Sequence, residues 1–154
     1  RIYFLFYAFD KREIERGVLS KVRDPVTLAK NILLVDDELD VIYTIKNVLE
    51  DNGFQIDSYN DPITALNSYR SNFYDLVILD IKMPKMDGFE LYTKLKEKDP
   101  KVKICFLTAG ELFYEELRNA QLKLGEKIGE EYFIQKPIKT GQLVDKINTF
   151  IITK

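Results

Sequence analysis

Apolar residues in this chain alternate between short strand-like runs and longer stretches at helical spacing. The run Leu76–Leu79 contains four consecutive apolar residues, which is typical of a strand buried on both faces. Similar strand patterns cover residues 32–35, 54–59, 102–107 and 132–135. Each is followed by a stretch with apolar residues three or four positions apart, which predicts an amphipathic helix. From residue 31 onward the chain therefore predicts five strand–helix units.

Five units of this length indicate one parallel sheet with helices on both faces. Turn signals agree, because Asn52-Gly53 ends the first helix and Asp61-Pro62 begins the second with an N-cap and a proline. We predict the α/β class: a flavodoxin-like (βα)5 doubly wound parallel sheet with strand order 2-1-3-4-5. We assign residues 29–154 to this domain, and residues 1–28 to an N-terminal extension of unknown role.

Polar residues whose side chains are capable of binding or catalysis follow four of the strands. Asp36-Asp37 follows the first strand, Asp80 the third, Thr108 the fourth and Lys136 the fifth. The carboxyl ends of parallel strands meet at one edge of the sheet, where open α/β folds place their ligand sites. We therefore expect these side chains to converge.

Three convergent carboxylates disfavour joint ionisation, so this edge requires a cation. Oxygen ligands favour a hard ion such as Mg²⁺, which takes few carboxylates and leaves room for phosphoryl oxygens. A carboxylate held there is a possible nucleophile that forms an acyl phosphate. Lys136 adds a second cation, and the Thr108 hydroxyl is a potential donor to a phosphoryl oxygen.

In this order and placement, the motifs resemble the receiver domain of two-component response regulators, of the single-domain, chemotaxis-regulator type. The resemblance covers about residues 31–152. It implies that Asp80 is the phosphoacceptor and a direct Mg²⁺ ligand together with Asp37. It further implies that the backbone carbonyl of Lys82 is a third ligand and that Asp36 acts partly through metal-bound water.

The same resemblance gives roles to the residues of the last two strands. Thr108 matches the switch hydroxyl, and Phe133 the aromatic switch position, which requires partial exposure. Lys136 matches the lysine that contacts the acyl phosphate, and the bond to Pro137 is usually cis in the family. Phosphorylation is expected to draw Thr108 inward and let the Phe133 ring turn in.

The resemblance also implies a signalling role. Asp80 is expected to take a phosphoryl group from the phospho-histidine of a sensor histidine kinase or a phosphotransfer protein. This switches the face formed by the fourth helix, fifth strand and fifth helix, which then binds a downstream protein. Such a domain is no conventional enzyme, because it catalyses only its own phosphorylation and dephosphorylation, and its expected location is cytoplasmic.

Composition removes several other functions. The 154 residues contain no histidine, which excludes imidazole metal ligands and histidine catalysis, and a single cysteine, Cys105, which excludes an intrachain disulfide. A net charge of −2 gives no general basic field for nucleic acid. No apolar stretch approaches the roughly 20 residues that span a bilayer, so membrane insertion is not expected.

Alternatives stay open at this point. A flavodoxin-like cofactor binder needs a phosphate-cradling loop where this chain has Asp36-Asp37-Glu38. A phosphatase of the haloacid-dehalogenase type needs a second aspartate where this chain has Lys82. A degenerate receiver that acts as a phosphorylation-independent interaction module conflicts with intact Asp80, Thr108 and Lys136. Taken singly, each of these side chains also has an ordinary structural explanation, such as helix capping by Asp36 or Asp37.

Two segments depart from the family pattern. The stretch between Thr108 and Lys136 is longer than usual and includes residues 125–131. Residues 1–30, which include the extension, carry seven Lys and Arg against four Asp and Glu, so the remainder of the chain has a net charge of −5. The apolar residues 2–9 of the extension are expected to pack on the domain or on a second copy, which makes a homodimer possible. Because the chain starts at Arg1, we expect a processed or truncated product.

Overall fold

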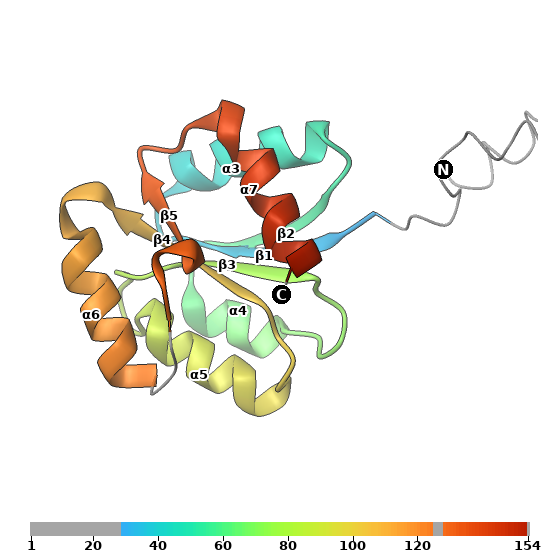
Figure 1. Ribbon diagram of the computed structural model, residues 1–154. Helices are drawn as coiled ribbons and strands as arrows, with labels where there is room; N and C mark the ends of the chain where they lie inside the picture. Colours follow the sequence, from blue (N-terminus) through green and yellow to red (C-terminus); the bar gives the residue numbers. More distant parts are fainter. Residues whose placement is uncertain (1–28, 125–127, 154) are drawn as a thin grey trace, which may run out of the picture.

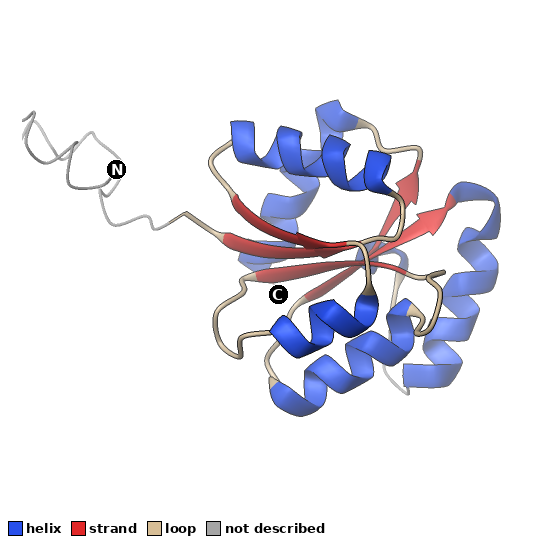
Figure 2. Cartoon of the chain, turned by 180° about the vertical axis from the view of Figure 1, so that it is seen from behind, coloured by secondary structure: helices blue, strands red, loops and turns tan. Residues whose placement is uncertain are grey.

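The computed structural model describes residues 29–124 and 128–153, in which a five-stranded parallel sheet lies between two layers of helices (Figure 1 and Figure 2). The predicted strand order is confirmed, because the strands lie in the order β2-β1-β3-β4-β5. The elements are β1 (Asn31–Val35), α3 (Leu39–Asp51), β2 (Gln55–Tyr59), α4 (Pro62–Ser68), β3 (Leu76–Asp80), α5 (Gly88–Lys98), β4 (Ile104–Ala109), η2 (Gly110–Leu112), α6 (Phe113–Leu124), η3 (Glu130–Tyr132), β5 (Phe133–Lys136) and α7 (Thr140–Thr153).

Strand residues alternate between two hydrophobic cores. Leu33 and Val77 belong to the core on the side of α4, α5 and α6, whereas Leu34 and Ile78 belong to the core on the side of α3 and α7. All five residues of β3 are buried. Side chains that alternate across a sheet covered on both faces must be apolar at every position, which explains the unbroken runs in the sequence.

Helix α3 and helix α7 cover one face of the sheet, and α4 and α5 cover the other (Figure 1). The predicted start of α4 is confirmed, because Asp61 accepts a hydrogen bond from the amide of Ile63, and Pro62 is the first helical residue. Asp87 caps α5 in the same way, by accepting a hydrogen bond from the amide of Glu90. These caps fix where the loops after β2 and β3 end.

Strand β4 differs from the predicted range 102–107 at both ends, because it begins at Ile104 and ends at Ala109. The strand extends to Ala109 because Thr108 pairs with Gln135 and Ala109 with Lys136 of β5. Thr108 therefore lies within a paired strand rather than after it. The peptide bond between Lys136 and Pro137 is cis, as the family resemblance implied.

The expectation that the N-terminal extension packs on the domain or on a second copy concerns residues 1–28, which lie outside the described part of the chain, as do residues 125–127. The boundary between extension and domain stays a prediction. Among residues 29–124 and 128–153, no helix combines the length and hydropathy that a membrane span requires.

Candidate phosphoryl-acceptor site

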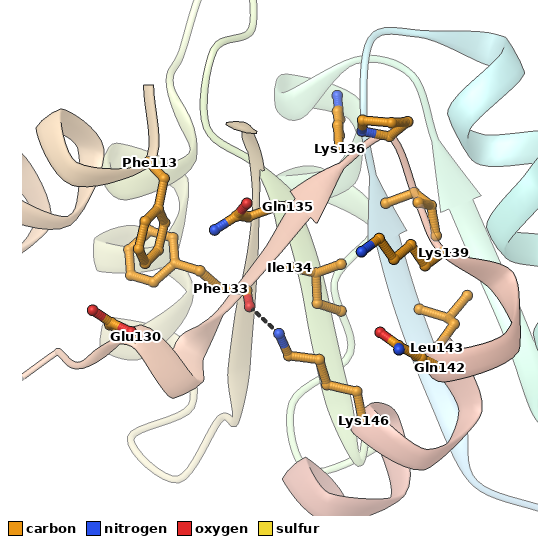
Figure 3. A pocket seen from close by; sticks show the side chains of 12 residues that line it. Phe113, Glu130, Phe133, Ile134, Gln135, Lys136, Lys139, Gln142, Leu143 and Lys146 are labelled. Carbon is orange, nitrogen blue, oxygen red and sulfur yellow. Dashed lines mark hydrogen bonds between the residues drawn. The ribbon is translucent and has the colours of Figure 1, made fainter. Parts of the chain in front are cut away.

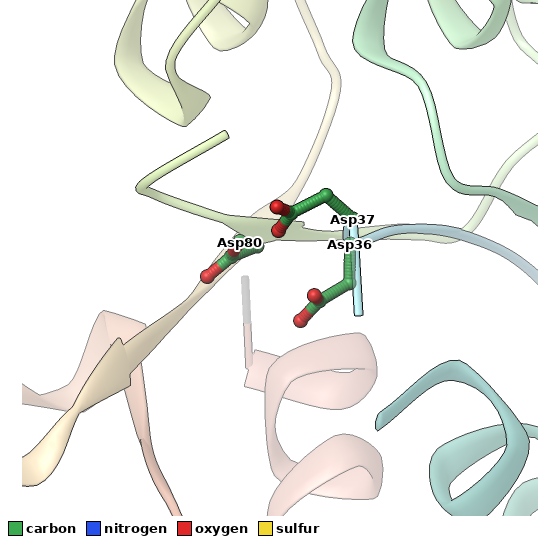
Figure 4. A group of neighbouring side chains, drawn as sticks. All are labelled: Asp36, Asp37 and Asp80. Carbon is green, nitrogen blue, oxygen red and sulfur yellow. The ribbon is translucent and has the colours of Figure 1, made fainter. Parts of the chain in front are cut away.

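The ends of β1 and β3 bring three carboxylates together at the carboxyl edge of the sheet (Figure 4). Asp80 is the last residue of β3, and Asp36 and Asp37 follow β1 directly. One carboxylate oxygen from each lies within 4.8 Å of those of the other two. Asp36 and Asp80 are buried, and Asp37 is exposed. The predicted convergence is therefore present, with one member open to solvent.

Lys136, at the end of β5, supplies the cation of this cluster. Its Nζ lies 2.8 Å from Asp36 Oδ2, 3.0 Å from Glu38 Oε1 and 3.2 Å from Asp80 Oδ1. The ammonium thus contacts three carboxylates, two from the loop after β1 and one from the end of β3. A single positive charge faces four acidic side chains, so the cluster keeps an excess of negative charge.

Burial and the neighbouring charges shift the pKa values of this cluster. Burial, followed by the charge of Asp36, raises the pKa of Asp80 to about 7. Burial also raises the pKa of Asp36, although Lys136 and the amide of Glu38 oppose it. Burial alone lowers the pKa of Lys136, but the contacts with Asp36 and Glu38 and the charge of Asp80 outweigh it and raise that pKa above its usual value. Asp80 therefore needs additional positive charge to be fully ionised at neutral pH.

The donor set fits a hard divalent cation. Asp36 Oδ1 accepts a hydrogen bond of 2.8 Å from the amide of Glu38. Among the described residues, Asp36 Oδ2 is buried and accepts no hydrogen bond of normal geometry despite its closeness to Lys136 Nζ. A buried carboxylate oxygen that pairs with an ammonium but meets no donor of good hydrogen-bond geometry, beside two further carboxylates, suits an oxygen-coordinated ion such as Mg²⁺. Lys82, whose backbone carbonyl is the third predicted ligand, is an exposed residue in the loop after β3.

Gly88, the first residue of α5, holds this loop against the site. Its amide donates a hydrogen bond of 2.8 Å to the carbonyl of Ile81. A Cβ atom at position 88 would lie 2.3 Å from the carbonyl oxygen of Asp80 and 3.0 Å from Ile81 Cα. Both neighbours are backbone atoms, so a side chain here forces the end of β3 to move.

We expect the substitution Gly88→Ala to lower the free energy of unfolding by roughly 1–3 kcal/mol, because it overpacks the backbone at Asp80. Gly141 is the matched control, since a Cβ there meets nothing within 4 Å. Gly141→Ala should be neutral or stabilising by up to about 1 kcal/mol, because alanine loses less chain entropy on folding. Urea unfolding of both variants measures the difference, and equal effects would contradict the close approach at Gly88.

Thr108 lies on the strand next to Asp80, one residue past the partner of Asp80 in the ladder. It is buried, and its hydroxyl donates a hydrogen bond to Glu116 Oε2 of α6. Thr108 Oγ1 also lies 3.2 Å from the carbonyl oxygen of Ala109. Glu116 is itself buried, and burial raises its pKa while the hydrogen bond from Thr108 lowers it. The predicted switch hydroxyl is therefore engaged with a carboxylate outside the Asp80 cluster.

Phe133 at the start of β5 is only 1% exposed, whereas the predicted switch role requires partial exposure. Its ring packs edge-on against Phe113 and at a tilt against Phe106, with centroids 5.6 Å apart in both cases. A groove of about 360 Å³ runs along β5 and α7, where Lys146 Nζ donates a 2.6 Å hydrogen bond to the Phe133 carbonyl (Figure 3). The ring already occupies the inward position in this structure.

Sequence reasoning gave no role to two residues of the site, Glu38 and Glu116. Glu38 directly follows Asp36-Asp37, and that position was the available signal. Glu116 lies three residues after Phe113 and four before Ala120, both of which are buried in α6. An acidic residue on the apolar face of a helix is a detectable signal, because such a position is buried and its carboxylate then needs a partner.

Comparison with known proteins agrees with this geometry. The family model described as "response regulator receiver domain" matches residues 32–148. The chain is 33% identical over 151 residues to hybrid signal transduction histidine kinase L of Dictyostelium discoideum, and 30% identical over 116 residues to the transcriptional regulatory protein DltR of Streptococcus agalactiae. These alignments cover 93% and 75% of this chain, but only 8% and 49% of the two relatives.

Solved structures with the same fold include two complexes that contain magnesium and a beryllium fluoride. The response regulator TrrA from Thermotoga maritima, in complex with Mg²⁺ and BeF, is 31% identical with a TM-score of 0.62, and the match covers 79% of this chain and 98% of that one. The CheX–CheY–BeF3–Mg complex from Borrelia burgdorferi gives 27% identity, a TM-score of 0.67, and coverage of 80% and 90%.

Proposed function

Because this chain belongs to the response regulator receiver family, we propose that Asp80 accepts a phosphoryl group from the phospho-histidine of a sensor histidine kinase or a phosphotransfer protein. The observation that carries the proposal is the placement of Asp80. It is a buried strand-end carboxylate, 3.2 Å from the ammonium of Lys136 and grouped with Asp36 and Asp37. Phosphoryl groups of sensor kinases derive from ATP, so the proposal also places the domain in the cytoplasm.

The residues present account for the transfer. An oxygen of Asp80 attacks phosphorus, a P–O bond forms as the P–N bond to histidine breaks, and the imidazole nitrogen takes up a proton. Lys136 holds the attacking carboxylate in place and faces the charge of the arriving group. Asp36, Asp37, Asp80 and the Lys82 carbonyl are the groups that would hold Mg²⁺, and the bound ion would supply positive charge to the transferring phosphoryl group. In hydrolysis, water attacks phosphorus, the P–O bond to Asp80 breaks, and the products are inorganic phosphate and the free Asp80 carboxylate.

Mg²⁺ is expected to bind saturably and to raise the melting temperature of the protein, since it binds the folded state. In Asp37→Asn the affinity should fall about tenfold or more, because a charged ligand is lost. Asp37 is exposed, so this variant should fold. Asp51→Asn, an exposed carboxylate in α3, is the matched control and should leave the affinity unchanged. Equal Mg²⁺ affinity in all three proteins would contradict the site.

The output surface is proposed to be the face of α6, β5 and α7. The groove along β5 and α7 lies there and includes Lys139 and Lys146 (Figure 3). Helix α6 adds two exposed apolar side chains, Tyr114 and Leu122. Lys136 links this face to the site, because it ends β5 and contacts Asp80. A downstream protein or a second copy of the chain is the proposed occupant.

The proposed reaction is tested with a small-molecule phosphoryl donor. Incubation of the full chain with phosphoramidate and Mg²⁺ should add one phosphate, seen by intact-mass analysis at neutral pH. The adduct should fail to form with EDTA in place of Mg²⁺, and it should disappear within hours because acyl phosphates hydrolyse. An adduct that forms equally with EDTA, or that survives alkaline treatment, would contradict an aspartyl phosphate.

A further inference from the structure

The Thr108 hydroxyl has one proton to donate, and in this structure it lies beside two acceptors, Glu116 Oε2 and the carbonyl oxygen of Ala109. We propose that Glu116 is a positioning residue that holds the Thr108 hydroxyl in the unphosphorylated protein and must release it before Thr108 donates to a phosphoryl oxygen on Asp80. The inference rests on the proposed function, and names a step that regulates it. Phosphorylation then exchanges one hydrogen bond for another and frees a carboxylate on α6.

The geometry leaves little freedom for both bonds at once. A threonine hydroxyl carries a single O–H donor, and Glu116 Oε2 accepts it in this structure. Thr108 is 1% exposed and Glu116 3% exposed, so water is largely kept from both. A phosphoryl oxygen on Asp80, on the neighbouring strand, is the competing acceptor. Because the proton serves one acceptor at a time, the two states of Thr108 exclude each other.

Release of Thr108 changes the position of Glu116. Glu116 lies on the buried face of α6 with Phe113 and Ala120, where an unpaired carboxylate is costly. The positive charge of Lys82 acts on this carboxylate more strongly than the negative charge of the neighbouring Glu115. Once Thr108 turns away, Glu116 gains by moving toward Lys82. A shift of this side chain repositions α6, which carries the exposed Tyr114 of the proposed output surface.

Glu116 offers a signal path that does not depend on the aromatic switch. Phe133 is already buried and packs against Phe113, the first residue of α6. Because the ring already points inward, an inward turn on phosphorylation would not change its position. The contact that does differ between the two states of Thr108 is the one with Glu116.

The affinity of the Mg²⁺-loaded protein for beryllofluoride, a stable phosphoryl mimic, tests the proposal by isothermal titration. Glu116→Leu removes the competing acceptor from an apolar position, so beryllofluoride should bind about tenfold more tightly, the order expected when a hydrogen bond to a charged group no longer has to be broken. Glu116→Gln keeps a weaker, neutral acceptor and should give a smaller gain of about threefold. Glu115→Gln, an exposed neighbour that removes the same charge, should bind like the wild type.

The same titration in a Thr108→Val background separates positioning from a general effect on the fold. Without the hydroxyl, Glu116→Leu should give no gain, because the coupling between the two residues is lost. An equal gain with and without the hydroxyl, or unchanged affinity in Glu116→Leu, would overturn the role of Glu116 and leave the phosphoacceptor assignment intact. Failure of the wild type to bind beryllofluoride would overturn both.

Discussion

Replacement of Asp80 by asparagine is expected to abolish phosphorylation by phosphoramidate or by a phospho-histidine donor. The amide is a poor nucleophile, and Asp80 is the strand-end carboxylate of the cluster, in contact with Lys136 and beside the Asp36-Asp37 pair. We expect the yield of the labile adduct to fall more than about 100-fold, as when a nucleophile is removed from an active site. Intact-mass analysis under saturating donor and Mg²⁺ measures it.

In the absence of Mg²⁺, Asp80→Asn should have a higher free energy of unfolding at neutral pH than the wild type. The pKa of Asp80 is raised, so the folded protein binds more protons than the unfolded chain between about pH 4 and pH 7, and stability falls as pH rises through that range. Asparagine removes this dependence. Asp51→Asn is the control for both measurements and should keep wild-type phosphorylation. An adduct of undiminished yield in Asp80→Asn would place the nucleophile elsewhere.

Replacement of Lys136 by methionine should have the largest effect on stability. It removes the cation that lies 2.8 Å from the fully buried Asp36 and 3.2 Å from Asp80, while keeping most of the side-chain volume. Loss of one partner from a buried ion pair costs about 3–5 kcal/mol, because the remaining charge stays buried. Urea unfolding in EDTA at neutral pH measures the loss, and phosphorylation of the variant should be reduced as well.

Lys139→Met is the matched control, because Lys139 is an exposed lysine three residues further along the chain. Its effect should stay within about 0.5 kcal/mol, as for most surface substitutions. Added Mg²⁺ should restore part of the stability lost in Lys136→Met, since the ion supplies charge to the same carboxylates. A Lys136 variant as stable as the Lys139 variant would contradict the role of Lys136 as the counter-ion of the cluster.

The fold was predictable because β3 and its neighbours are buried on both faces, which makes their apolar runs unbroken. The Asp61-Pro62 signal placed the start of α4 correctly, since capping depends on local chemistry. The end of β4 was predicted too early. Apolarity stops at Leu107, but hydrogen bonding to β5 continues through Ala109. Strand ends set by pairing are not visible in a pattern that records only polarity.

The convergence of Asp36, Asp37 and Asp80 was also predictable, because the edge of a parallel sheet follows from chain topology. The partner of Thr108 was not. Whether Glu116 faces solvent or β4 depends on how α6 docks, and an acidic residue in a helix is usually exposed. The burial of Phe133 also depends on how α6 docks, because its ring packs against Phe113 at the start of that helix.

The most direct test of the central claim is chemical identification of the phosphorylated residue. Borohydride reduces an aspartyl phosphate to homoserine, so the freshly phosphorylated chain can be reduced, digested and sequenced by mass spectrometry. Homoserine at position 80, and its absence when Mg²⁺ is replaced by EDTA, is the predicted result. Homoserine at position 36 or 37, or a stable phosphate on Thr108 with residue 80 unmodified, would contradict the assignment of Asp80 as phosphoacceptor.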